Sequence, residues 1–324
     1  MDNSLTFLNA CRNGQKTIVQ IFLKKGGLNI NKRDGEGNTA LHYACAKGYR
    51  DIVISLLENG ADVNMPNNDS ETPLHFAAKS GSKEIIECLI HYGAEINATD
   101  KNGRTALLHL LDNKRTDASL FLITQGADPE LADLDGHKAI DYAVAHGLRE
   151  VVEHISHDET SDSSGNTPLH QAVYNGQSEI VKILLSAGNI TVDITNDKGE
   201  TPLIIACMMG NSMIAKMLVE AGANVDKASL GGNAPLHFAS ISGNIHLGKT
   251  LLEANANYNA RNSDGRTSLI IAAREGKNEF VSMLVEHKAD VNIADNFGNT
   301  ALHYATEKGY NEIVEILLEA GAEG

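Results

Sequence analysis

The sequence contains no tryptophan, and aromatic residues make up only 5% of its 324 residues, so aliphatic side chains must fill the core. It also lacks the run of about eighteen apolar residues that a membrane-spanning helix requires. The first residues, MDNSLTFLNACRNG, lack the basic and long apolar regions of a secretory signal. These absences argue against a membrane-spanning or secreted protein. We expect a cytoplasmic chain, with the nucleus as the alternative compartment.

Cysteine and basic residues are also scarce. The four cysteines form no CxxC pair, and Cys11, Cys45 and Cys207 each follow an alanine on an apolar helix face, so we predict buried free thiols. The 27 lysines and arginines stand against 42 acidic residues, which gives a net charge of −15. Such an acidic chain repels nucleic-acid phosphates and anionic membranes. Neutral or basic protein segments are the partners that this charge favours.

One short string recurs along the chain. Copies of Gly-x-Thr-(Pro/Ala)-Leu-His include GNTALH at 37–42, SETPLH at 70–75, GNTPLH at 165–170 and GNTALH at 298–303. With weaker copies included, the third residue of the string falls at positions 39, 72, 105, 138, 167, 201, 234, 267 and 300. Most steps are 33 residues, and a degenerate tenth unit precedes them, where Leu5-Thr6-Phe7 leads into residues 10–14. A fixed period of this length indicates a repeat architecture.

This period and this string resemble those of the ankyrin repeat family, over almost the whole chain. The resemblance implies an all-α solenoid of ten helix-turn-helix units with short β-hairpin fingers. In the second unit, Thr39 caps the first helix and Gly48 ends it. The second helix is predicted from about Asp51 to Asn59, where Gly60 follows, and the finger turns at residues 67–70. A two-helix unit cannot bury both of its faces alone, so neighbouring units must stack.

The fourth unit departs from the pattern, because Lys114 replaces the glycine between its two helices. A lysine in the left-handed conformation costs about 1 kcal/mol or more. Two interpretations are open: the turn differs in this unit, or the unit is locally weak.

The fifth unit ends at residue 157 without its finger, and the acidic, polar segment DETSDSSGN follows. We predict repeats 1–5 in residues 1–157, a linker at 158–164, and repeats 6–10 in residues 165–324. The alternative is one continuous stack with an irregular loop. The last repeat keeps its apolar residues Ile313, Val314, Ile316, Leu317 and Leu318 and shows little capping. We therefore expect the natural protein to continue beyond Gly324.

The sequence offers no recognisable catalytic or metal-binding motif. The chain has no GxxxxGK[ST], GxGxxG, HExxH or GxSxG string, so we expect no enzyme and no cofactor. The resemblance implies that the histidines of the recurring string bond the threonine hydroxyl and nearby backbone; these are His42, His75, His170, His237 and His303. His146, His154 and His157 offer a weak zinc site without a completing ligand, and we predict no metal there.

The positions that vary between repeats are candidates for binding a partner, since the shared positions hold the fold. The resemblance implies that partners lie against the fingertips and the exposed side of the first helices. We predict a binding surface in repeats 6–10 formed by Tyr174, Asn175, Met208, Met209, Leu230, Ile241, Arg266, Arg274 and Phe297. Its apolar members form a candidate interaction patch. The alternative is that the two methionines fill the core between helices.

These observations favour a monomeric array that binds a protein or peptide, as an intracellular scaffold or adaptor. One alternative is an N-terminal regulatory array of a larger enzyme, GTPase regulator or channel. Another is a host-directed effector of an intracellular microbe. A fold of this kind does not choose between them.

Overall fold

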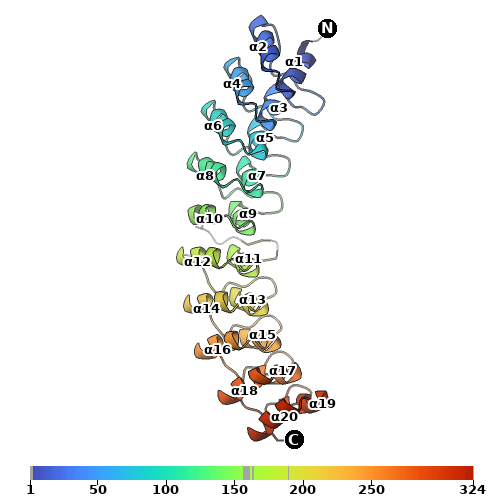
Figure 1. Cartoon of the computed structure of the whole chain (residues 1–324), viewed down its shortest axis with the longest axis vertical. Coiled ribbons are helices and arrows are strands. Elements are labelled where there is room, and N and C mark those ends of the chain that lie inside the picture. The colour runs from blue at the N-terminus through green and yellow to red at the C-terminus, as the bar shows by residue number, and fades with distance from the viewer. Residues whose placement is uncertain (1–2, 156–160, 163, 189, 324) are drawn as a thin grey trace. The chain divides into compact units, whose positions relative to one another are not determined.

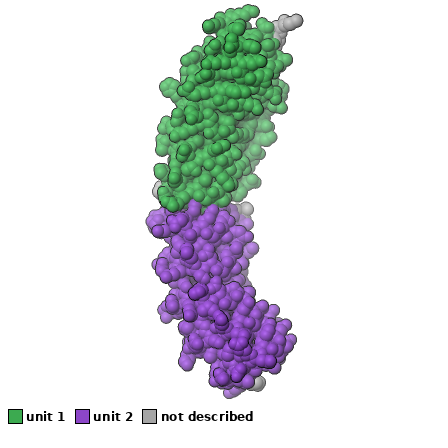
Figure 2. Space-filling view, in the orientation of Figure 1, with its two compact units in different colours: residues 1–156 green, residues 157–324 purple. Residues whose placement is uncertain are grey.

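The computed structural model describes residues 3–155, 161–162, 164–188 and 190–323. These residues form two compact units, 1–156 and 157–324, which are coloured separately in Figure 2. Each unit is built of helix pairs, one pair to a repeat (Figure 1). Among the described residues, no helix combines the length and the apolar content needed to cross a bilayer.

The described residues of the first unit form ten helices: α1 (Asn3–Arg12), α2 (Lys16–Lys25), α3 (Ala40–Ala46), α4 (Arg50–Glu58), α5 (Pro73–Ser80), α6 (Lys83–His91), α7 (Ala106–Asp112), α8 (Thr116–Thr124), α9 (Ala139–Ala145) and α10 (Arg149–Ile155). The second unit contains ten more: α11 (Pro168–Tyr174), α12 (Ser178–Ser186), α13 (Pro202–Met208), α14 (Ser212–Glu220), α15 (Pro235–Ser242), α16 (Ile245–Glu253), α17 (Ser268–Arg274), α18 (Asn278–Glu286), α19 (Ala301–Lys308) and α20 (Asn311–Glu319). The all-α solenoid predicted from the repeats is confirmed.

The helices of each unit form two layers. The odd-numbered first helices pack on one another in chain order, and so do the even-numbered second helices. Small residues such as Ala44, Ala77, Ala172 and Ala206 are fully buried, which lets neighbouring first helices approach closely. Each repeat therefore buries its apolar faces against its neighbours.

In repeats 2, 3, 6 and 8, the recurring histidine bonds the backbone of the following repeat. In the second repeat, His42 Nδ1 accepts a hydrogen bond from the Thr39 backbone N–H at 3.0 Å and lies 2.9 Å from the Thr39 hydroxyl. Its Nε2 then donates to the backbone carbonyl of Glu71, in the following repeat, at 3.0 Å. The predicted bond between histidine and threonine is confirmed for His42, His75 and His170. It is wrong for His237, because position 234 is an alanine and the ring bonds backbone groups alone. In the last repeat it is the backbone N–H of His303 that donates to the Thr300 hydroxyl. Burial lowers the pKa of His42 to about 4, so the ring is held in its neutral form.

The fingers are closed turns. Asp34 N–H donates to the Asn38 carbonyl at 3.0 Å, and the Asp34 carboxylate accepts the backbone N–H groups of Glu36 and Asn38, both at 2.9 Å. Consecutive fingers share a single backbone bond, such as Leu230 N–H to the Lys198 carbonyl at 3.1 Å. A single hydrogen bond between two fingers does not form a β-sheet. Within the described ranges, the one isolated β-bridge pairs Thr99 with Thr105.

Lys114 keeps the turn of the fourth repeat. Its φ is +57°, close to the +75° of Gly48, and its N–H donates to the Leu111 carbonyl as that of Gly48 does to Cys45. The interpretation that the turn differs is therefore wrong, and the lysine adopts the strained left-handed conformation itself.

Replacing this lysine should relieve the strain. We expect Lys114→Gly to raise the free energy of unfolding by up to about 1 kcal/mol, because glycine adopts this conformation without a steric penalty but loses more entropy on folding. Urea titration followed by circular dichroism measures the change. Asn113→Gly is the matched control, since Asn113 has a φ of −87° and glycine there should not stabilise. Equal effects of the two substitutions would contradict the assignment of strain to Lys114.

One glycine lies inside a second helix. Gly248 of α16 occupies the position of Val53, Val181 and Val281 in other repeats. Any Cβ atom on it would lie 2.7 Å from the ring of Phe280 and 2.4 Å from the methyl of Met283. Phe280 is completely buried, so Gly248 makes room for the ring of the next repeat.

The predicted linker falls mostly outside the described residues. Within it, Asp162 takes part in a finger turn, since its carboxylate accepts the backbone N–H groups of Ser164 and Asn166 at 2.8 Å each. Linker residues 158–160 and 163 are not among those described. The division into 1–157, 158–164 and 165–324 stays a prediction.

Candidate functional site

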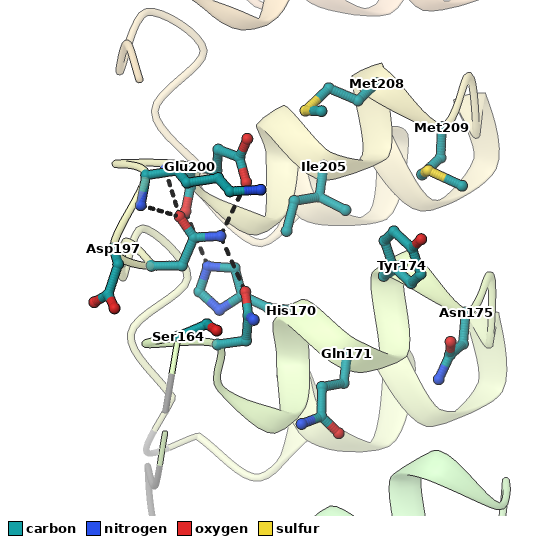
Figure 3. Close-up of a pocket in the computed structure, with 13 residues that line it drawn as sticks. Ser164, His170, Gln171, Tyr174, Asn175, Asp197, Glu200, Ile205, Met208 and Met209 are labelled. Carbon is teal, nitrogen blue, oxygen red and sulfur yellow. Dashed lines mark hydrogen bonds between the residues drawn. The ribbon is translucent and has the colours of Figure 1, made fainter. Parts of the chain in front are cut away.

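A hollow of about 550 Å³ opens between repeats 6 and 7 in the second unit (Figure 3). One side is formed by the ends of α11 and α13, and the other by the fingers that precede these helices. Its lining comprises Ser164, Asn166, His170, Gln171, Tyr174, Asn175, Asn196, Asp197, Lys198, Glu200, Ile205, Met208 and Met209.

The apolar side chains of the hollow come from the ends of α11 and α13. Tyr174 ends α11, Met208 ends α13 and Met209 follows it, and Figure 3 shows the three side chains together with Ile205. Tyr174 is 63% exposed, Met208 49% and Met209 52%. The core residues of α13 precede Met208 in the helix and are buried, whereas both methionines are about half exposed. The alternative that they fill the core is wrong.

The finger side is polar and internally bonded (Figure 3). Asn196 Oδ1 accepts the backbone N–H groups of Lys198 and Glu200 at 3.0 and 2.9 Å. Its Nδ2 donates to the Asn166 amide oxygen at 3.0 Å and to Glu200 Oε2 at 2.9 Å. His170 Nε2 donates to the Glu200 carbonyl at 3.0 Å, and burial lowers the pKa of this histidine. This network holds the Glu200 carboxylate at the hollow.

Four of the nine predicted site residues line this hollow: Tyr174, Asn175, Met208 and Met209. Leu230 lies beside it, since its backbone N–H bonds Lys198 and its side chain is 77% exposed. Ile241 is exposed at the position of α15 that Met208 holds in α13.

The other three predicted residues do not line the hollow. Phe297 is exposed on the finger of the tenth repeat. Arg266 forms ion pairs with Asp264 at 2.9 Å and Asp295 at 3.6 Å, and Arg274 lies 3.9 Å from Glu275. Arg266 therefore has partners within the chain.

Sequence reasoning missed Ile205 and the finger residues of the hollow, Asn196, Asp197, Lys198 and Glu200. It also missed Leu134, which is 78% exposed on a finger of the first unit. The signal for Leu134 was present, because it holds the same finger position as Leu230, one residue after the polar residue that closes the turn.

Two groups of titratable side chains lie in the first unit. Glu71, Asp100 and His109 are buried with ligand atoms within 4.8 Å of one another, and Asp133, Asp135 and His137 form a more exposed group. His109 Nε2 lies 3.0 Å from Asp100 Oδ2. Glu71 pairs with Lys79. Carboxylates and imidazoles that already bond to other side chains bind a metal ion less readily.

The histidines considered for zinc are separate from these groups. His146 Nε2 lies 3.3 Å from Asp112, and His154 Nδ1 lies 3.1 Å from the Glu150 carbonyl. His157 lies outside the described residues. The cysteines are free thiols, and Cys11, Cys45 and Cys207 are buried as predicted, whereas Cys88 is only partly buried. Burial raises the pKa of Cys11 to about 12 and that of Cys45 well above its usual value, so neither forms the thiolate that nucleophilic catalysis needs.

Comparison with known proteins finds repeats of one kind along the chain. The family profile described as ankyrin repeats in three copies matches residues 2–67, 61–133, 112–196, 140–229, 189–262 and 236–324. BCL-6 corepressor-like protein 1 of Homo sapiens is 47% identical over 49 residues, which are 15% of this chain and 3% of that protein. The Mus musculus protein of the same name is 45% identical over 49 residues, with the same coverage. The likeness thus spans a small fraction of these relatives.

Proposed function

Because the chain belongs to the ankyrin repeat family, whose repeats are protein–protein interaction modules, we propose that it acts as an intracellular scaffold or adaptor that binds a partner segment at repeats 6–8. The observation that carries this proposal is the hollow of repeats 6 and 7, with Tyr174, Met208 and Met209 exposed together. Exposed apolar groups at a concave site favour binding. Methionine side chains adapt to irregular partner surfaces.

The proposed surface continues beyond the hollow. Leu230 and Ile241 extend the apolar surface into the eighth repeat, while Asn175 borders it with a polar side chain. Apolar anchors surrounded by polar groups are typical of protein interfaces. Arg266, Arg274 and Phe297 would lie at the periphery of a longer segment.

The test is a comparison of partner binding by the intact chain and by Met208→Ala/Ile241→Ala. Loss of two central anchors should cost on the order of 2 kcal/mol of binding free energy. Proximity labelling or pull-down from cell lysate finds the partners, and titration calorimetry then measures their affinities. Met213→Ala is the matched control, because Met213 is an exposed methionine of α14 that does not line the hollow. Unchanged partners in the double variant would place binding elsewhere.

A further inference from the structure

We propose that the partner presents a lysine or arginine side chain to Glu200, beside an apolar residue that contacts Tyr174, Met208 and Met209. This inference rests on the proposed function, since it names the chemistry of a segment bound in the same hollow. Equivalent positions in the third and seventh repeats differ in one respect that matters here: the third repeat has a lysine where the seventh has a methionine.

The third repeat contains the complete version of the contact. Glu71 Oε2 accepts from Asn67 Nδ2 at 3.2 Å, and Glu71 Oε1 pairs with the ammonium group of Lys79. That ammonium group also lies 5.8 Å from the centre of the Phe76 ring. Glu71 immediately precedes Thr72 of the recurring string, and Lys79 is the residue seven positions after this threonine.

The seventh repeat has the equivalent asparagine and glutamate, but a methionine replaces the lysine. Glu200 immediately precedes Thr201, and the residue seven positions after this threonine is Met208. Asn196 Nδ2 holds Glu200 Oε2 at 2.9 Å, as Asn67 holds Glu71. In the part of the chain that the structure describes, no lysine, arginine or histidine forms an ion pair with Glu200. The second oxygen is therefore open to a cation from outside.

The other titratable residues at the position of Glu200 have partners of complementary chemistry within the chain. Arg104 of the fourth repeat pairs with Asp112, at the position of Lys79, at 3.2 Å. His137 of the fifth repeat lies 3.6 Å from the Asp133 carboxylate. Arg266 of the ninth repeat pairs with two finger aspartates. Glu200 differs from these residues because, among the described residues, no side chain of opposite charge pairs with it.

The surroundings of Glu200 suit a long basic side chain. Met208, Met209, Ile205 and Tyr174 offer an apolar surface for its aliphatic stem, and the charged end reaches the carboxylate on the finger side. An arginine would also be able to stack on the Tyr174 ring. The electrostatic potential around the hollow also favours a cation, because the second unit is acidic. Residues 157–324 contain 11 lysines and arginines and 21 acidic residues, a difference of −10. The finger itself carries Asp197 and Glu200 against Lys198.

A random peptide library displayed on phage, selected on the purified chain, supplies the probes. We expect the enriched peptides to combine a lysine or arginine with a neighbouring apolar residue. Each is then synthesised with a fluorescent label in two forms, one with arginine and one with citrulline, which has the same shape and no charge. Fluorescence anisotropy should show binding at least tenfold weaker for the citrulline form. In Glu200→Gln, the difference between the two forms should disappear.

Two further variants sharpen the test. Met208→Lys places a cation where Lys79 stands in the third repeat. Both peptide forms should lose the apolar contact with Met208, and the arginine form should in addition lose its advantage over the citrulline form, while Met208→Leu should preserve the preference for arginine. Glu220→Gln removes the same charge from the outer helix α14, away from the hollow, and should leave the difference intact. Circular dichroism of each variant confirms folding.

The outcomes separate the two proposals. Peptides that need Met208 but bind equally as arginine and citrulline forms would overturn the role of Glu200 and leave the binding hollow standing. If Glu220→Gln abolished the preference for arginine to the same extent, the preference would arise from the overall negative charge of the unit. That result would also overturn the role of Glu200. Failure to obtain any peptide that depends on Met208 or Met209 would contradict the proposed binding site itself.

Discussion

Gly248→Val is expected to lower the free energy of unfolding by about 3 kcal/mol, near the upper end of the usual cost of overpacking a core. Valine is the residue found at this position in α4, α12 and α18, so the substitution is compatible with a helix. The cost comes from the next repeat, because Phe280 is fully buried and its ring occupies the space that the valine needs. Urea titration of the purified variant measures the loss.

The same contact offers an internal control. Phe280→Leu removes the aromatic ring and should cost about 1 to 3 kcal/mol by itself, since it leaves a cavity. In the Gly248→Val/Phe280→Leu double variant, the valine should fill part of that cavity. The combined loss should then be clearly smaller than the sum of the two single losses. Additive losses would show that Gly248 and Phe280 do not share the space.

Acidification is expected to destabilise the fold between about pH 6.5 and pH 4. Burial lowers the pKa of His42 to about 4, and also lowers the pKa values of His75, His109, His170 and His237 below their usual 6.5. The unfolded chain therefore takes up these protons at a higher pH than the folded chain does. The stabilisation is fully present above pH 6.5 and is lost as the pH falls towards the folded values. For His42 alone it amounts to about 3 kcal/mol.

The aspartates of the fingers affect the stability of the fold at lower pH than the histidines do. Burial alone would raise the pKa of Asp34, but hydrogen bonds from Tyr43 and from the backbone of Asn38 and Glu36 outweigh it and lower the value below 3.8. The stabilisation from such a group is lost only as the pH falls from about 3.8 towards its folded value. Losses between pH 6.5 and 4 thus report the histidines.

Urea titrations at a series of pH values test this expectation. His42→Gln should reduce the pH dependence in this range by about one proton and should cost about 1 to 3 kcal/mol at pH 7, since it disrupts buried hydrogen bonds. His303→Gln is the matched control for the cost at pH 7, because His303 is exposed in the last repeat and should matter little there. A stability that stays constant from pH 7 to pH 4 would contradict the proposed role of the buried imidazoles.

The parts of the fold that depend on local residues could be predicted from the sequence. Thr39, His42 and Gly48 each act within their own repeat or on the next one, and their spacing repeats often enough to be recognised. The second helix was predicted from Asp51 to Asn59 and is observed from Arg50 to Glu58. Helix ends depend on backbone geometry that varies by a residue or so, and Lys114 shows that a turn survives without its usual glycine.

The candidate site could be predicted only in part, because its two sides come from different segments. The exposure of Met208 and Met209 followed from their place at the end of a first helix. The position of Glu200 in the site could not be predicted, since a glutamate before the threonine of the recurring string looks the same in the sequence whether or not a lysine reaches it. The ion pair between Glu71 and Lys79 joins a finger to the helix that follows it. Without the structure, nothing indicates that residues eight apart are in contact there.

The single backbone bond between consecutive fingers gives the molecule a set of local reporters. The amide protons of Asn68, Lys101 and Leu134 in the first unit, and of Asp197, Leu230 and Asn296 in the second, each bond the finger before them. Each proton becomes available for exchange with solvent deuterium when the contact between its two fingers opens. Amide exchange rates at these positions would therefore map the opening of the array one junction at a time. A ligand seated in the hollow should slow exchange first at Asp197 and Leu230, whose bonds flank it.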